Sequence, residues 1–159
     1  MTGGVDLSQI DGVNINTILT MMSETGFELK QRFKTAKHFA SWLGYAPNRK
    51  ITGDKVISSR TPKVKKPLTA AIRQAANSAG NSKTRLGDFF RRIAYRKGRE
   101  VAIIATARKI SVIIYKMLET GEEYSYAQEE IDKLKNTQIK KIQRTIKKFD
   151  IKKEELILA

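Results

Sequence analysis

A nearly continuous apolar run late in the chain sets the first condition on the fold. Residues 100–119 read EVAIIATARKISVIIYKMLE, which places apolar side chains on almost every side of a helix. A helix that is apolar all round must be enclosed by other elements, so the run predicts a buried central helix. Gly121 lies just beyond the run and is expected to end this helix.

Apolar residues elsewhere recur at helical spacing. They predict helices within residues 10–26, 35–43, 68–77 and 82–97, and Thr35 is expected to cap the second of these. The apolar faces are expected to hold Ile15, Ile18, Leu19 and Met22; Ala36, Phe39, Ala40 and Leu43; Leu68, Ala71, Ile72, Ala75 and Ala76; and Leu86, Phe89, Phe90, Ile93 and Ala94.

The fold class predicted from these patterns is all-α, because no segment predicts a strand. We expect a small helical domain with an N-terminal helix-hairpin-helix-like element and a C-terminal basic helix. Three parts are expected: a partial helix-hairpin-helix-like element over residues 1–29, a helical domain over residues 30–124, and a charged amphipathic helix with a tail over residues 125–159.

The N-terminal element is inferred from the DGVN turn at Asp11–Asn14. Gly12 would let backbone N–H groups at a helix N-terminus approach a phosphate, and Asn14 tolerates a positive φ. Asp11 would repel that phosphate. An ordinary helix start is the alternative interpretation, and the residues alone leave both open.

The charge of the chain is large and unevenly placed. Residues 30–109 hold 21 Lys or Arg and three acids, a net charge of +18 for this segment. The formal net charge of the whole chain is +15, so this segment carries all of the excess. Residues 1–29 hold four acids and no Lys or Arg, and residues 110–159 are nearly balanced. Such a concentration of like charge fits a polyanionic partner, most simply nucleic acid.

Several classes of protein are excluded by composition. The chain has no cysteine, so neither a disulfide framework nor a thiolate zinc site is expected. No apolar run reaches about 18 residues, so no membrane partner is expected. The N-terminus lacks the features of a signal peptide, and a cytoplasmic, nucleoid-associated protein is expected.

The segment 45–67 has no helical period and contains all three prolines of the chain. Within it, residues 50–60 read KITGDKVISSR, with hydroxyls at Thr52, Ser58 and Ser59. A hydroxyl in a cationic pocket can attack a DNA phosphate, and the same pocket can hold a phosphate passively. The residues favour passive binding and leave the nucleophile open.

The candidate DNA contacts extend beyond this segment to the two helices that follow it. Acids after residue 118 are interpreted as a solvated helix end, so no metal site and no cofactor are expected in this chain. The predicted DNA-binding residues are Gly12, Asn14, Arg49, Lys50, Gly53, Lys55, Arg60, Lys63, Lys65, Lys66, Arg73, Arg91, Arg92 and Arg96.

Several blocks in one order resemble a known family. They are IDGVNINTILTMMSETG, TAKHFASWLGYAPN, KITGDKV, LTAAIRQAANS, SKTRLGDFFRRIAYRKG and ATARKISVIIYKML. The order and spacing are similar to the C-terminal transposase domain of the IS-110-type (IS-116/IS-902) insertion-sequence transposases, a group that includes the Piv-type DNA invertases. The resemblance is nearly collinear from Val5 to Tyr124.

The resemblance implies a division of labour between two domains. Family members carry an N-terminal RuvC-like domain with four acidic metal-binding residues, and a C-terminal domain whose serine forms a covalent link to DNA. Some members are directed by a structured RNA, and they act as oligomers on paired DNA ends. A divalent metal is therefore expected only in the RuvC-like domain, which nothing in this sequence resembles.

One loop departs from the family pattern. Where the family has Ser–Gly–Gly–Lys, this chain has Thr52–Gly53–Asp54–Lys55. Thr52 then stands at the position of the nucleophile, although its extra methyl stiffens χ1 and crowds attack. Ser58 and Ser59 are weaker candidates because they lie out of register.

We therefore expect the DNA-binding C-terminal part of an insertion-sequence transposase, truncated and inactive in recombination by itself. Its expected partners are DNA and, by the resemblance, a guide RNA, further copies of the chain or a RuvC-like domain supplied in trans. The alternative is a stand-alone basic structural protein that binds nucleic acid without a recombinase role.

Overall fold

The computed structural model describes residues 4–26, 29–48, 50–58, 60–124 and 138–146. The chain divides into two compact units, Met1–Tyr124 and Ser125–Ala159. In the first unit the elements run in the order η1 (Leu7–Gln9), α1 (Ile15–Thr25), α2 (Leu29–Arg32), α3 (Ala36–Trp42), β1 (Lys50–Thr52), β2 (Lys55–Ser58), α4 (Pro67–Ala79), α5 (Arg85–Lys97) and α6 (Arg99–Thr120). The predicted all-α class is confirmed, and the boundary expected between residues 29 and 30 stays a prediction.

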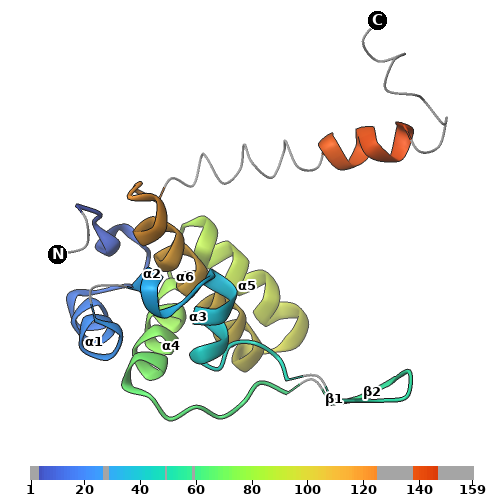
Figure 1. Ribbon diagram of the computed structural model, residues 1–159, viewed down its shortest axis with the longest axis horizontal. Coiled ribbons are helices and arrows are strands. Elements are labelled where there is room, and N and C mark those ends of the chain that lie inside the picture. The colour runs from blue at the N-terminus through green and yellow to red at the C-terminus, as the bar shows by residue number, and fades with distance from the viewer. Residues whose placement is uncertain (1–3, 27–28, 49, 59, 125–137, 147–159) are drawn as a thin grey trace, which may run out of the picture. The chain divides into compact units, whose positions relative to one another are not determined.

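Helix α6 is the central element of this unit, as its apolar sequence predicts. Helices α3, α4 and α5 pack against it (Figure 1). Its enclosed side chains include Ile110 and Ile114, and Gly121 ends it in the left-handed conformation with φ +73°. Two buried tyrosines tie the surrounding segments together: Tyr115 donates to the Phe33 carbonyl at 2.7 Å, and Tyr45 donates to the Thr69 carbonyl at 2.7 Å.

Helix α4 begins with a proline and takes its cap from another helix. Pro67 fits the first helical position because the N–H of a residue there has no partner within the helix, so proline loses no hydrogen bond by lacking one. The next free N–H, of Leu68, donates to the Glu24 carboxylate at 2.7 Å. Glu24 lies near the end of α1, so this contact joins the end of one helix to the start of another.

The turn before α1 is shaped by close contact with α4. Gly12 has φ +81°, and a Cβ atom there would lie 2.1 Å from the Ala75 carbonyl oxygen. Asn14 has φ −119° and caps α1, accepting from the Thr17 N–H at 2.9 Å. The structure therefore gives this turn a packing role and an ordinary helix start.

The buried face of α1 differs from the one expected. The helix buries Thr17, Met21 and Thr25, whereas Ile15 is 63% exposed and Leu19 is 56% exposed. The expectation that Ile15 and Leu19 face the core was wrong. Gly12 lets the start of α1 pack closely against α4. In this position the helix turns Thr17, Met21 and Thr25 inward.

A two-stranded antiparallel hairpin stands where an irregular loop was expected. In it, β1 and β2 pair Ile51 with Val56 and Thr52 with Lys55, with an irregularity between Lys50 and Ile51. The absence of strands was a wrong expectation for residues 50–58. β-Branched residues here flank a two-residue loop that begins with glycine, which is a hairpin pattern. The hairpin extends away from the helices (Figure 1).

The second unit is described only over residues 138–146, which are helical. Ile139 and Ile142 are exposed there, beside Lys140, Lys141 and Arg144. The charged amphipathic helix expected within residues 125–159 is helical where the structure describes it, and the rest of that segment lies outside the described residues. No helix in the described part of the chain combines the length and apolarity needed to cross a membrane.

Candidate nucleic-acid interface

The TGDK sequence forms the tip of the hairpin. Thr52 and Lys55 are Cα partners, and Gly53 and Asp54 form the loop between them. Gly53 has φ +57°, a value that suits the first loop position of a two-residue hairpin. A Cβ at Gly53 would meet only open space, and all four residues are exposed. The tip is therefore free to contact a large partner.

The three candidate nucleophiles have different surroundings. Around Thr52, no described residue forms a hydrogen bond with the hydroxyl, so this group faces solvent. The Ser58 hydroxyl accepts from the Arg60 N–H at 3.5 Å, a long bond at the end of the strand. Ser59 lies outside the described residues. An activated hydroxyl needs a base within about 3 Å, and the described side chains bring none to Thr52.

Exposed cations flank the hairpin. The Asn48 N–H donates to the Arg60 carbonyl at 3.0 Å and closes the base of the hairpin. Arg49 and the side chain of Lys50 lie outside the described part of the structure. Within that part, no acid pairs with the following exposed side chains: Lys55, Arg60, Lys63 and Lys65.

Lys66 differs from these neighbours because its side chain is held by the helical body. Its Nζ atom lies 3.4 Å from the centroid of the Trp42 ring and donates to the Trp42 carbonyl at 3.1 Å. Burial lowers the pKa of Lys66; the Glu24 carboxylate opposes this shift and the Arg32 charge adds to it. Lys66 therefore anchors the end of the loop and has less freedom to meet a phosphate.

Arg91 is also engaged within the molecule. Its guanidinium donates to the Gly80 carbonyl at 3.0 Å and to the Ser82 carbonyl at 2.7 Å, and it pairs with the Asp88 carboxylate at 2.5 Å. These bonds hold the connection between α4 and α5. Of the predicted contacts on α5, Arg92 and Arg96 are therefore the more available.

An open hollow of about 570 Å³ lies between α4 and α6. Arg73 contributes one cation, and Arg99 another, whose guanidinium donates to the Asn77 side chain at 2.8 Å. Glu100 also lines this hollow, so positive and negative charges both contribute to the electrostatic potential of the hollow. The hollow is lined by Arg73, Gln74, Asn77, Arg99, Glu100, Ile103 and Ile104.

A second, smaller hollow of about 270 Å³ lies between α5 and α6. Its apolar lining residues are Ile93, Val101 and Ala105, and no acid lines it. Its cations are Arg92, Arg96 and Lys97.

The sequence that forms most of this helical body and the hairpin matches a known family. A family model described as "Transposase IS116/IS110/IS902 family" matches residues 6–91, more than half of the 159 residues. The chain belongs to this transposase family. No curated protein matches the chain. A role connected with insertion-element transposition follows from the family.

The family match covers the hairpin and the first half of α5. It covers the tip residues Thr52 to Lys55 as well as Arg73 and Arg91. Among the described residues of this transposase chain, no cluster of three or more His, Asp or Glu side chains could hold a metal ion. Among the groups that the described residues present at the hairpin tip are the hydroxyl of Thr52 and the ammonium of Lys55.

The structure adds residues that the sequence analysis did not select. Lys97 and Arg99 line the two hollows, and Tyr95 stands exposed on the same helix as Arg92. Lys97 follows Arg96 directly and belongs to the same cationic cluster, which is a signal the sequence carries. The sequence gives no sign that Tyr95 is exposed, because another tyrosine, Tyr45, is buried.

Proposed function

We propose that this transposase-family chain binds the DNA backbone through its hairpin and the basic residues that flank it. The observation that supports this most directly is the exposed set of cations at Lys55, Arg60, Lys63 and Lys65, which no described acid neutralises. Unneutralised cations on a projecting element repel one another, and a phosphate backbone relieves that repulsion.

The hairpin shape suits this role. A two-stranded ribbon is narrow enough to enter the major groove of duplex DNA, or to follow a strand along its phosphates. The exposed Thr52 hydroxyl at its tip can donate to a phosphate oxygen. The role proposed for Thr52 is therefore phosphate contact, and nucleophilic attack by Thr52 is the alternative carried over from the family resemblance.

Strand exchange in this proposal requires a second catalytic part. The resemblance assigns the metal-binding carboxylates to a RuvC-like domain, which would act together with this chain on DNA. A guide RNA and further copies of the chain are proposed partners on the same basis. The proposed location is the cytoplasm, in association with the nucleoid.

A salt series tests the proposal. Affinity for a labelled duplex is measured between low and moderate salt for the wild type and for Lys55/Lys63/Lys65→Ala. Each phosphate contact contributes about −0.9 to the slope of log K against log salt. Replacing the three lysines should flatten the slope by about 2 to 3.

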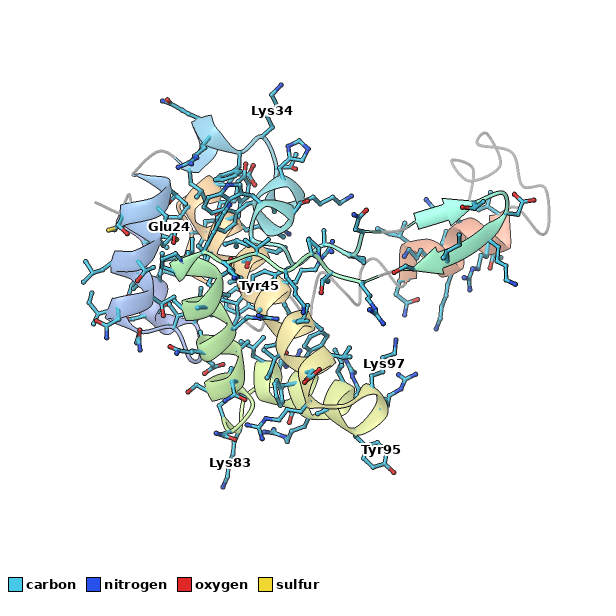
Figure 2. All side chains as sticks on the ribbon, turned by 90° about the horizontal axis from the view of Figure 1, so that it is seen from below. Glu24, Lys34, Tyr45, Lys83, Tyr95 and Lys97 are labelled. Carbon is cyan, nitrogen blue, oxygen red and sulfur yellow. The ribbon has the colours of Figure 1, made fainter. Side chains whose placement is uncertain are left out.

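The matched control removes the same charge elsewhere. Lys34, Lys37 and Lys83 are exposed, and Lys34 and Lys83 lie on the helical body away from the hairpin (Figure 2). Lys34/Lys37/Lys83→Ala should change the slope by less than about 1. Equal flattening in both variants would mean that net charge alone drives binding, and the hairpin proposal would then be wrong.

A further inference from the structure

Tyr95 on α5 is the most exposed large apolar side chain in the described part of the chain, at 94%. It points away from the helices (Figure 2). A buried aromatic ring removes about 150–250 Å² from water, so leaving this one outside forgoes a large stabilisation. Packing within the described unit therefore does not account for a tyrosine at this position.

The surroundings of Tyr95 are cationic. Arg92 lies three residues before it, so their Cβ atoms are about 5–6 Å apart on the helix surface. Arg92 and Arg96 both line the hollow between α5 and α6, together with Lys97. The nearest acid along the helix, Asp88, is already paired with an arginine at 2.5 Å.

We propose that Tyr95 is a stacking site for an unpaired nucleobase, and that Arg92 and Arg96 hold the adjoining phosphates. This inference rests on the proposed function, that the chain binds nucleic acid. Proteins hold single strands with exposed aromatic rings beside a positively charged groove, and Tyr95 lies next to Arg92 and Arg96, which line the hollow. The bases of a regular duplex already stack on one another, so only an unpaired base offers its face to the ring.

The geometry limits what the site recognises. A ring on the helix surface touches a base on one face and leaves the hydrogen-bonding edges of the base free. The site therefore binds any base with similar strength, and it distinguishes unpaired from paired strands. In this proposal α5 holds a strand that has been opened, while the hairpin contacts the duplex backbone.

The test compares a fully paired duplex with the same duplex carrying a short central single-stranded gap. The gap contains 2-aminopurine, whose fluorescence falls when an aromatic ring stacks on it. The wild type should bind the gapped duplex more tightly and quench the fluorophore. Tyr95→Ala should weaken gapped binding by about 5- to 150-fold and abolish quenching, because stacking contributes about 1–3 kcal/mol per base.

Two controls separate stacking from other roles of Tyr95. Tyr95→Phe removes only the hydroxyl, so it should keep both the affinity and the quenching. All three proteins should bind the paired duplex equally, since Tyr95 is too exposed for its replacement to disturb the fold. Repeating the gap with deoxyribose and with ribose nucleotides shows whether the site prefers opened DNA or an RNA strand.

The outcomes are distinguishable. Equal gapped binding by wild type and Tyr95→Ala, with paired binding intact, overturns the stacking site and leaves the proposed function standing. Loss of gapped binding in Tyr95→Phe as well would mean a hydrogen bond from the hydroxyl, and it also overturns stacking. Absence of binding to either duplex by the wild type overturns the proposed function itself.

Discussion

The Lys66 ammonium lies over the Trp42 ring, 3.4 Å from its centroid, and also donates to the Trp42 carbonyl. Trp42 ends α3, and Lys66 immediately precedes α4. This pair therefore closes the segment that carries the hairpin, because it fixes one end of that segment to the helical body. The sequence places Lys66 in a run of lysines that are predicted to bind DNA, and the structure gives its side chain a structural contact within the protein.

Replacing Lys66 should therefore affect stability. Lys66→Ala removes a cation–π contact and a charge-assisted hydrogen bond, so the free energy of unfolding should fall by about 1–2 kcal/mol. Lys65→Ala is the matched control and should change it by less than about 0.5 kcal/mol, because Lys65 is exposed. Urea unfolding followed by fluorescence of Trp42, the single tryptophan, measures both. Equal losses in the two variants would contradict the anchoring role.

Gly12 should be intolerant of any side chain. A Cβ there would lie 2.1 Å from the Ala75 carbonyl oxygen, and the residue has φ +81°. Gly12→Ala should destabilise the protein by about 3 kcal/mol or more, from backbone displacement added to conformational strain. Gly26→Ala carries strain alone, since Gly26 has φ +73° and ψ −171° with open space at its Cβ, and should cost about 1–3 kcal/mol. Thermal unfolding of both variants decides, and a milder effect at Gly12 than at Gly26 would refute the close contact.

How far the sequence could predict this fold depends on the element. The period of α4 predicts most of its buried residues because its apolar side chains lie on one face. Helix α6 is apolar on almost every side, and this predicts its central position. Helix α1 buries Thr17, Met21 and Thr25, a less apolar face than the one that its period predicts, and Gly12 packs the start of this helix against α4. The hairpin was missed because its strands, Lys50–Thr52 and Lys55–Ser58, are too short to show alternation, and its remaining signal is the two-residue loop that begins with Gly53.

The sequence predicts where the positive charge of the candidate site lies, and it does not predict which of the cations are held by contacts within the protein. Sequence locates the basic segment, yet Lys66 and Arg91 look the same as Lys65 and Arg92 until their partners are known. Backbone carbonyls accept from Lys66 and Arg91, and no sequence pattern shows such contacts. The exposure of Tyr95 depends in the same way on which face of α5 meets α6.

Alkaline pH should destabilise the protein through Tyr45. Burial raises the pKa of Tyr45, and the nearby Arg73 charge only partly opposes this. The unfolded chain loses this proton near pH 10, while the folded chain keeps it, so the free energy of unfolding falls as pH rises above about 10. Tyr45→Phe cannot ionise and should flatten that fall.

The comparison needs a reference at neutral pH. Tyr45→Phe also loses the hydrogen bond to the Thr69 carbonyl, so it should be less stable than wild type by about 1 kcal/mol at pH 7. The two proteins should converge between about pH 10 and pH 11 in urea unfolding. Parallel curves across this range would show that the Tyr45 proton does not govern alkaline stability.

Variants of Thr52 distinguish two roles for its hydroxyl at the hairpin tip, phosphate contact and covalent attack on DNA. Its hydroxyl is exposed, and no described side chain is placed to take its proton, so the expected role is a single hydrogen bond to phosphate. Thr52→Val preserves the shape of the side chain and removes that bond, which should weaken duplex binding by about 5-fold or less. Thr52→Ser should bind as the wild type does. A denaturing gel of each protein with labelled duplex reports any covalent adduct. An adduct formed by wild type and Thr52→Ser but missing from Thr52→Val would establish Thr52 as a nucleophile and overturn the passive role.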